Sequence, residues 1–280
     1  MACVSRTRPV RVGEVDLETE VWGEGEPLVV IQTALTADEL RPLAEQLAGD
    51  GELEVIHYHR RGYAGSGPAL RPGSIAQDAA DCRFLLEALA VGPAHVVGAS
   101  YSAAVALTLA TRCPDVVRTL TVLEPPPSGV PSTPDFVAAS TRLVESYSSR
   151  GPTVALDELM GMLAGPDWRA ESERDLPGSV AAMERDAPTF FESDLPALLS
   201  WELDDADATR ITCPVLYVGG GQSGPWFAEV RTRIRRLLPQ TESATVAGAG
   251  HLLALSHAAD TARLVLDFLR RHRSAGAART

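Results

Sequence analysis

The chain has 280 residues, 45% of them hydrophobic, and a formal net charge of −12. This length allows a sizeable core in one domain, or in one domain with a large insertion. The negative charge excludes nucleic acid and anionic membranes as expected partners, because both repel an acidic surface.

The cysteines and the N-terminal residues predict a cytoplasmic protein. The four cysteines are scattered, with neither metal-ligand nor redox spacing, which is typical of reduced thiols. The N-terminal residues include arginines but not the apolar run of a signal peptide. No apolar stretch is long enough to cross a membrane.

Up to residue 124, short apolar runs alternate with segments of helical periodicity. The first two runs predict a hairpin, and the later continuous runs predict strands buried on both faces of a sheet. The expected strands cover residues 10–12, 17–22, 28–31, 55–58, 95–98 and 116–123. Helical spacing of apolar residues predicts helices at 38–47, 74–90 and 101–112. This alternation predicts a mostly parallel sheet covered by helices on both faces.

The alternation stops between residues 125 and 210, where the sequence contains no convincing buried strand. A connection of this length is not structureless in a compact protein, and it carries helix signals such as Thr133-Pro134-Asp135. The earlier pattern then resumes, with strands at 215–218 and 242–246, a helix at 226–238 and a final helix ending near residue 271. We therefore expect a core of residues 1–124 and 211–280 and a helical cap of residues 125–210.

The most informative stretch is Gly98-Ala99-Ser100-Tyr101-Ser102, which lies between an apolar strand and a helical run. It follows the strand–nucleophile–helix pattern G-x-S-x-G, except that a serine replaces the last glycine. The pattern needs small side chains two residues either side of the nucleophile, because the turn is tight, and Ser102 meets that need. The alternative is an ordinary loop of small residues.

This elbow, the turn at residues 61–66, the Gly250-His251 turn and the mid-chain cap resemble the α/β-hydrolase superfamily over nearly the whole chain. The resemblance implies a mostly parallel eight-stranded sheet flanked by helices, with a helical cap inserted after strand six. It also implies a nucleophile, an acid and a histidine in this order along the chain. It says little about the substrate, because this fold hosts many reactions.

The resemblance assigns Ser100 as the nucleophile and His251 as the base. A serine hydroxyl needs a base to take its proton, and His251 lies after the last strand, where the family places its histidine. The loop at residues 219–226, where family members usually carry the acid, contains no carboxylate.

Glu124 is the expected acid because it ends a buried apolar run, where an unpaired charge would be costly. Lactonases resembling the zearalenone-degrading enzymes place their acid at this strand end, in a similar Glu-Pro sequence. The alternative is a glutamate that fixes the cap hinge by accepting backbone hydrogen bonds.

The expected oxyanion hole consists of the backbone N–H groups of Tyr101 and Ala34. Family members usually have His-Gly where this chain has Gln32-Thr33. A threonine adopts glycine geometry only at a cost, so the choice of first donor between Thr33 and Ala34 stays open, and Gln32 is a candidate for the site wall.

Aromatic and methionine side chains suggest further pocket residues. Trp226 lies in the loop that lacks an acid, and the cap contributes Met160, Trp168 and Trp201. Methionines and aromatics suit an adaptable apolar cavity. For each of these residues, packing within the protein core is the alternative.

These features predict a serine hydrolase that cleaves an ester or lactone of an apolar small molecule through an acyl-enzyme. No metal-ligand spacing and no phosphate-binding glycine loop is present, so we expect no metal and no cofactor. A homodimer is compatible with the sequence. One alternative is a non-catalytic small-molecule binding protein on the same fold. Another is a fold-related lyase or cofactor-free oxygenase.

Overall fold

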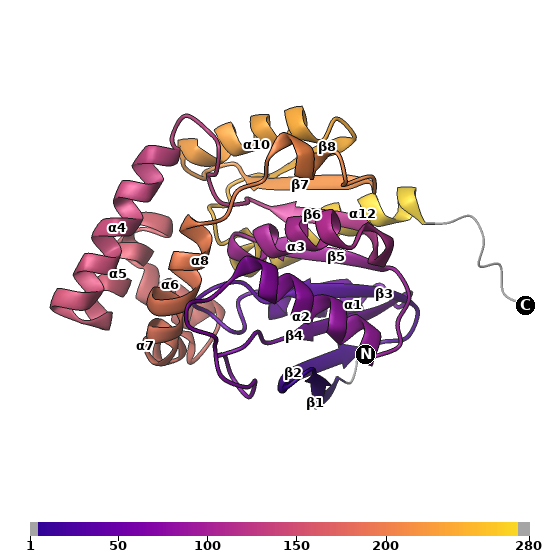
Figure 1. The fold of residues 1–280 in the computed structure, drawn as a ribbon, viewed down its shortest axis with the longest axis horizontal. Coiled ribbons are helices and arrows are strands. Elements are labelled where there is room, and N and C mark those ends of the chain that lie inside the picture. The colour runs from indigo at the N-terminus through magenta and orange to yellow at the C-terminus, as the bar shows by residue number, and fades with distance from the viewer. Residues whose placement is uncertain (1–4, 274–280) are drawn as a thin grey trace, which may run out of the picture.

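The computed structural model describes residues 5–273 and has an eight-stranded sheet at its centre (Figure 1). The strand order is β1-β2-β4-β3-β5-β6-β7-β8. Strand β2 pairs antiparallel with β1 and β4, and all other neighbours are parallel. The bounds are β1 (Arg6–Val12), β2 (Val15–Trp22), β3 (Glu26–Ile31), β4 (Leu53–Tyr58), β5 (Ala94–Ala99), β6 (Val117–Leu123), β7 (Val215–Gly220) and β8 (Thr241–Val246). The predicted mostly parallel, eight-stranded sheet is confirmed.

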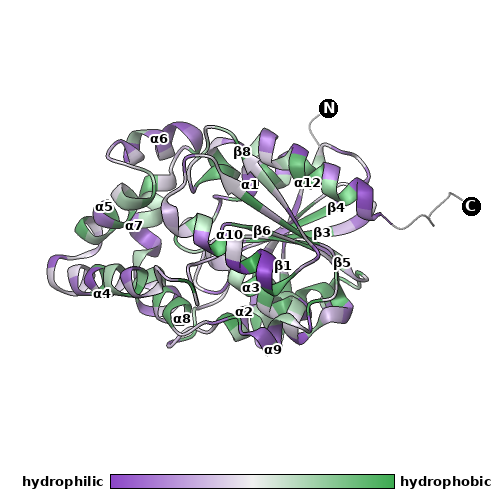
Figure 2. Cartoon of the chain, turned by 90° about the horizontal axis from the view of Figure 1, so that it is seen from above, coloured by the Kyte–Doolittle hydropathy of each residue, from purple (hydrophilic) through white to green (hydrophobic). Residues whose placement is uncertain are grey.

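Helices cover both faces of this sheet (Figure 2). One face carries α2 (Ile75–Ala88), α3 (Tyr101–Arg112) and α10 (Pro225–Leu237), whose apolar side chains share one buried cluster. The other face carries α1 (Arg41–Ala48), α11 (Leu253–Ser256) and α12 (Ala258–His272), which bury a second cluster. A short 3-10 turn (Pro114–Val116) leads into β6.

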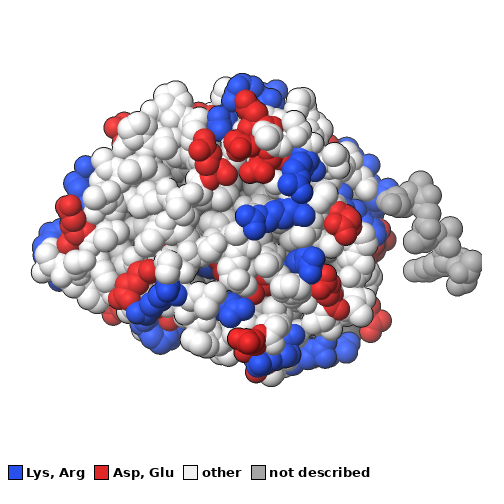
Figure 3. Space-filling model, in the orientation of Figure 1, with Lys and Arg blue, Asp and Glu red and all other residues white. Residues whose placement is uncertain are grey.

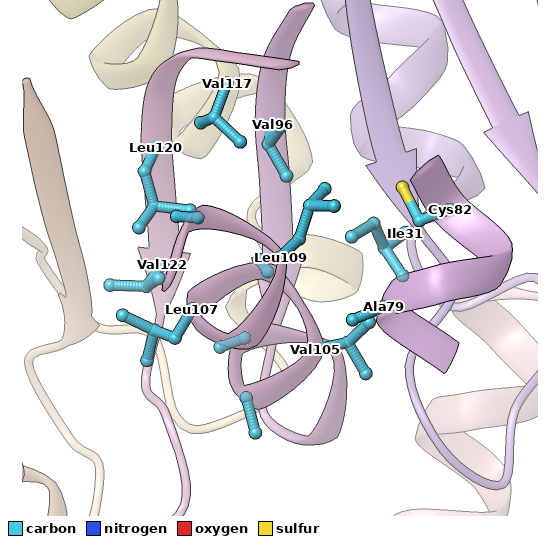
Figure 4. Packing of buried hydrophobic residues seen from close by; sticks show 14 of the residues in the cluster. Ile31, Ala79, Cys82, Val96, Val105, Leu107, Leu109, Val117, Leu120 and Val122 are labelled. Carbon is cyan, nitrogen blue, oxygen red and sulfur yellow. The ribbon is translucent and has the colours of Figure 1, made fainter. Parts of the chain in front are cut away.

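Strand β5 and helix α3 form the centre of the packing. All six residues of β5 are buried, as expected for a parallel strand covered on both faces. Leu107 and Leu109 of α3 pack with Val96 of β5 and with Leu120 and Val122 of β6 (Figure 4). This packing fixes the first turn of α3, and therefore the residue that precedes it, against the sheet.

Between β6 and β7 the described chain forms helices and loops and no strand. These helices are α4 (Thr133–Arg150), α5 (Pro152–Leu163), α6 (Trp168–Asp175), α7 (Ser179–Thr189), a π-helical turn (Phe190–Asp194), α8 (Leu195–Leu199) and α9 (Asp205–Ala208). Helices α4 to α8 lie beyond one end of the sheet (Figure 1) and bury an apolar cluster of their own. The cap boundaries at residues 125 and 210 stay a prediction.

Helix α1 begins three residues later than expected, at Arg41. Asp38 does not cap it, because its carboxylate lies 3.0 Å from Nε2 of His59. Residues 36–40 instead form a turn, held by hydrogen bonds from Glu39 N–H to Thr36 O and from Arg41 N–H to Asp38 O. This turn forms part of the site described below.

Acidic and basic side chains lie next to one another at several places on the surface seen in Figure 3. Many charged side chains of the protein pair, as Arg169 does with Asp157 and Glu184. Such exposed pairs contribute little to stability. Among residues 5–273 no helix is long and apolar enough to span a bilayer.

Candidate active site

Ser100 lies on a strained turn between β5 and α3. Its φ of 48° and ψ of −116° are unusual for a non-glycine residue and direct the chain sharply from strand to helix. A Cβ on Gly98 would lie 2.3 Å from the Ser102 carbonyl oxygen, which explains the need for glycine there. The Ser102 hydroxyl accepts a hydrogen bond from Ala99 N–H (2.9 Å) and donates one to Ala99 O (3.0 Å), so this serine braces the turn.

Glu124 follows β6 and binds His251. Its Oε2 lies 2.8 Å from His251 Nδ1, and its Oε1 accepts a hydrogen bond of 2.7 Å from Gly220 N–H. The carboxylate is nearly inaccessible to solvent, because the residue is only 1% exposed. Both carboxylate oxygens therefore have a hydrogen-bond partner. One binds the imidazole of His251, and the other binds the backbone at the end of β7.

The two glycines that end β7 make room for this carboxylate. A Cβ on Gly219 would lie 3.3 Å from Glu124 Oε1, and one on Gly220 would lie 2.5 Å from Ala249 O and 2.6 Å from Gly250 O. In other family members this region usually carries the acid. Here it provides an N–H donor and space for the Glu124 carboxylate. The backbone before His251 packs directly against this region.

His251 is oriented by Glu124 and by an aromatic ring. Phe227, at the start of α10, stacks on the imidazole with ring centroids 4.3 Å apart and planes at 14°. With Nδ1 directed at Glu124, Nε2 is the nitrogen left for Ser100. The two residues line one cavity but are not hydrogen bonded to each other. Catalytic contacts of this kind often tighten only with substrate bound.

The backbone N–H groups of the two predicted oxyanion-hole residues, Tyr101 and Ala34, have no helical or backbone partner among the described residues. Tyr101 is the first residue of α3, so its N–H has no partner within the helix. Ala34 lies in the same cavity wall, and within residues 5–273 its N–H has no hydrogen-bond acceptor. The next N–H, that of Leu35, is occupied by the Tyr63 hydroxyl at 2.9 Å. Leu35 has a φ of 68°, whereas Thr33 is not among the described residues with a positive φ, so its backbone does not need glycine geometry.

A buried arginine connects the segment before the predicted oxyanion donor Ala34 with the cap. Arg60 is 2% exposed, donates to the carbonyl oxygens of Gln32 (3.0 Å) and Thr33 (3.3 Å), and pairs with Asp78 (2.8 Å) and Asp194 (2.6 Å). Burial alone would lower the Arg60 pKa, but the two carboxylates raise it well above its ordinary value. Burial raises the pKa of Asp78 to about 6, although Arg60 opposes that shift.

Two tyrosines extend this network to the nucleophile turn. The hydroxyl of Tyr101 donates to Asp78 at 2.8 Å, and the hydroxyl of Tyr63 donates to Asp194 at 2.6 Å. The Arg60 guanidinium lies 4.2 Å from the centre of the Tyr101 ring. Asp194 belongs to the π-helical turn between β6 and β7, so this segment and the segment after β3 contact one charged cluster.

A cavity of about 100 Å³ connects these parts. Ser100, Tyr101 and His251 line it together with Ala34, and side chains from the cap close it. Of the predicted wall residues, Met160 and Trp226 line the cavity. The remaining wall is mainly apolar, and its large side chains are Leu35, Phe136, Leu143, Leu159, Met162, Leu163, Phe190, Leu195, Leu198, Phe227 and Leu252.

Gln32, Trp168 and Trp201 do not line this cavity, which corrects our expectation for them. Gln32 is fully buried, where its amide accepts from Arg60 N–H (2.7 Å) and donates to Thr33 O (2.6 Å). Trp168 packs in the apolar core of the cap. Trp201 packs against the apolar cluster shared by α2, α3 and α10. Its indole N–H donates to Thr108 of α3 at 3.0 Å.

Sequence reasoning missed Phe227, Arg60, Asp194 and Glu39. Phe227 directly follows a predicted pocket residue, and this adjacency was its only signal. Arg60 and Asp194 are far apart in the chain and meet only through the fold. Within the described chain, no group of three or more His, Cys, Asp or Glu residues is arranged to hold a metal ion.

Comparison with known proteins identifies the family of the chain. The profile of the Alpha/beta hydrolase family matches residues 33–264. A curated protein of Azorhizobium caulinodans, named "Putative carbamate hydrolase RutD", is 34% identical over 112 residues. That match covers 40% of this chain and 42% of the relative, so it spans less than half of either protein.

Two solved structures share the fold over nearly their full length. A thermophilic esterase of Thermogutta terrifontis superposes with a TM-score of 0.79 at 18% identity, covering 96% of this chain and 100% of the esterase. The enol-lactonase of Burkholderia xenovorans LB400 gives 0.76 at 19% identity, covering 94% and 100%. At these identities the likeness concerns the fold alone.

Proposed function

Because the chain belongs to the alpha/beta hydrolase family, we propose that it is a serine hydrolase that cleaves an ester or lactone of a mainly apolar small molecule. Ser100 is the nucleophile, His251 the general base and Glu124 the acid that orients it. The observation that carries the proposal is the Glu124–His251 hydrogen bond in the cavity that Ser100 also lines.

The chemistry follows from where the protons can go. Ser100 Oγ attacks the carbonyl carbon while His251 Nε2 takes the hydroxyl proton, and Glu124 stabilises the resulting imidazolium. The N–H groups of Tyr101 and Ala34 stabilise the oxyanion. Collapse of the tetrahedral intermediate expels the alcohol, which receives the proton from His251 and leaves an acyl-enzyme. Water then repeats the same steps to release the acid.

The substrate class is supported by the cavity and by the names of the relatives. The cavity wall is mainly apolar, which suits burial of a hydrocarbon body. The comparison proteins are named as an esterase, an enol-lactonase and a carbamate hydrolase, all of which cleave an acyl carbon from a leaving group. A non-catalytic binding protein on this fold would not need a carboxylate beside His251. The hydrogen bond between Glu124 and His251 therefore supports a hydrolase over this alternative.

A substrate screen tests the proposal. p-Nitrophenyl esters of graded chain length and lactones of graded ring size are offered to the wild type and to Ser100→Ala. We expect hydrolysis by the wild type, a loss of about 10³-fold or more in Ser100→Ala, and an acyl adduct on the Ser100 peptide by mass spectrometry. Turnover that survives Ser100→Ala, or an absence of turnover with every compound, contradicts the proposal. Turnover without an adduct would contradict the acyl-enzyme step and would indicate that His251 acts as a base on water directly.

A further inference from the structure

Glu39 is the one carboxylate among the described residues that line the cavity. It lies in the turn before α1, is 9% exposed, and lines the cavity that contains Ser100 and His251. Among residues 5–273, no side chain or backbone group forms a hydrogen bond with its carboxylate. The described residues that line the cavity include no arginine, and His251 is the one side chain among them that can carry a positive charge.

This lack of partners separates Glu39 from the other buried carboxylates of the site. Glu124 uses both oxygens, and Asp78 and Asp194 are held by Arg60 and by tyrosine hydroxyls. A buried carboxylate without a partner is costly. Accordingly, burial raises the pKa of Glu39 to about 7, and the charge of His251 only partly offsets that rise.

Glu39 does not take part in the Glu124–His251 pair. The Nδ1 atom of His251 already binds Glu124, and no hydrogen bond joins Glu39 to the imidazole. The unused hydrogen-bonding capacity of Glu39 therefore faces the space where a substrate binds. The same space is bounded by the rings of Phe136, Phe190 and Trp226. Aromatic faces attract cations, and a buried carboxylate gains most from a charged N–H donor.

We propose that Glu39 binds a protonated amine on the substrate. The inference rests on the proposed function, because it places this group in the same cavity as the scissile acyl bond. It narrows the substrate class to an ester or related acyl compound whose otherwise apolar body carries a basic nitrogen.

A binding experiment with matched ligands tests this inference without requiring turnover. Ser100→Ala protein is titrated calorimetrically, at about pH 7.5, with 2-(dimethylamino)ethyl acetate and with 3-methylbutyl acetate. These two esters have the same shape, and a protonated N–H in the first replaces a C–H in the second. We expect the amine to bind about tenfold more tightly, and we expect Glu39→Gln in the same background to abolish this preference.

Glu45→Gln is the matched control, because it removes an exposed glutamate of α1 that pairs with Arg41 and does not line the cavity. This control should keep the tenfold preference. Equal affinities for the two esters in Ser100→Ala, or a preference that survives Glu39→Gln, overturn the inference. Preferential amine binding with no ester hydrolysis by the wild type would sustain this inference and refute the proposed function. Hydrolysis of 3-methylbutyl acetate without any amine preference would do the reverse.

Discussion

At the scale of single residues, the site is held in unfavourable backbone conformations. Ser100 and Glu124 have φ values of 48° and 45°, each costing about 1–3 kcal/mol in a non-glycine residue. Sheet contacts maintain both. The N–H of Ser100 donates to Leu123 O at 2.9 Å, and that of Glu124 donates to Val218 O at 3.2 Å. The ends of β5, β6 and β7 thus fix Ser100 and Glu124 relative to each other.

Glu39 should make the stability of the protein depend on pH. Its pKa is raised from 4.5 to about 7 by burial, so the folded state binds the proton more tightly than the unfolded state. The contribution of Glu39 to the stability of the wild type is therefore lost as the pH rises from about 4.5 to 7, and Glu39→Gln lacks this loss. We expect Glu39→Gln to exceed the wild type in unfolding free energy by about 2–3 kcal/mol more at pH 8 than at pH 5.

Urea unfolding at both pH values measures this difference. The control is Glu202→Gln, which removes an exposed glutamate and should change stability equally at the two pH values. A constant difference between Glu39→Gln and the wild type across this range would show that Glu39 ionises normally in the folded protein.

At the scale of elements, the end of β7 positions the turn that carries His251. A Cβ on Gly220 would lie 2.5 Å and 2.6 Å from two carbonyl oxygens of the turn that carries His251, so Gly220→Ala must displace that turn. We expect kcat for an active ester to fall by about 10²-fold, because a displacement of about 1 Å is enough for that loss. Gly224→Ala is the control, since its Cβ would meet nothing within 4 Å. Equal kcat values in the two variants would mean that the loop does not position His251.

The cap and the core are joined by the Arg60 cluster. Asp194→Ala removes one of the two carboxylates from a guanidinium that is 2% exposed. Breaking a buried pair in this way destabilises a protein by about 3–5 kcal/mol. Asp175→Ala, also in the cap, removes a carboxylate whose partner Arg174 is two-thirds exposed, and it should cost less than about 1 kcal/mol. Guanidinium unfolding curves measure the loss of stability in each variant. Similar losses in the two would show that the cluster does not join the cap to the core.

At the scale of the whole molecule, the sequence predicts the parts of the fold that repeat a local signal. Continuous apolar runs located the parallel strands. A strand buried on both faces is apolar at nearly every position, so it stands out in the sequence. The start of α1 was missed because Asp38, a good capping residue, binds His59 from another strand end instead. The π-helical turn of the cap likewise has no periodic pattern of its own.

The candidate site divides in the same way. Ser100, Glu124 and His251 each end a strand or follow one, so the chain order and a small-residue turn were enough to single them out. Arg60, Asp194 and Glu39 acquire their environment only from tertiary contacts. The sequence did not separate Met160 and Trp226 from Trp168 and Trp201, because the cap core and the cavity wall use the same apolar side chains.

The central claim is that Ser100, His251 and Glu124 form one proton-transferring unit, and the rate of covalent labelling by a fluorophosphonate tests it most directly. We predict rapid labelling of the wild type on Ser100 and none in Ser100→Ala. Labelling of Glu124→Gln should be slower by about 10²–10⁴-fold with an unchanged thermal unfolding curve, because the amide cannot stabilise the imidazolium. Labelling of folded Glu124→Gln at the wild-type rate, or of a residue other than Ser100, would contradict the account.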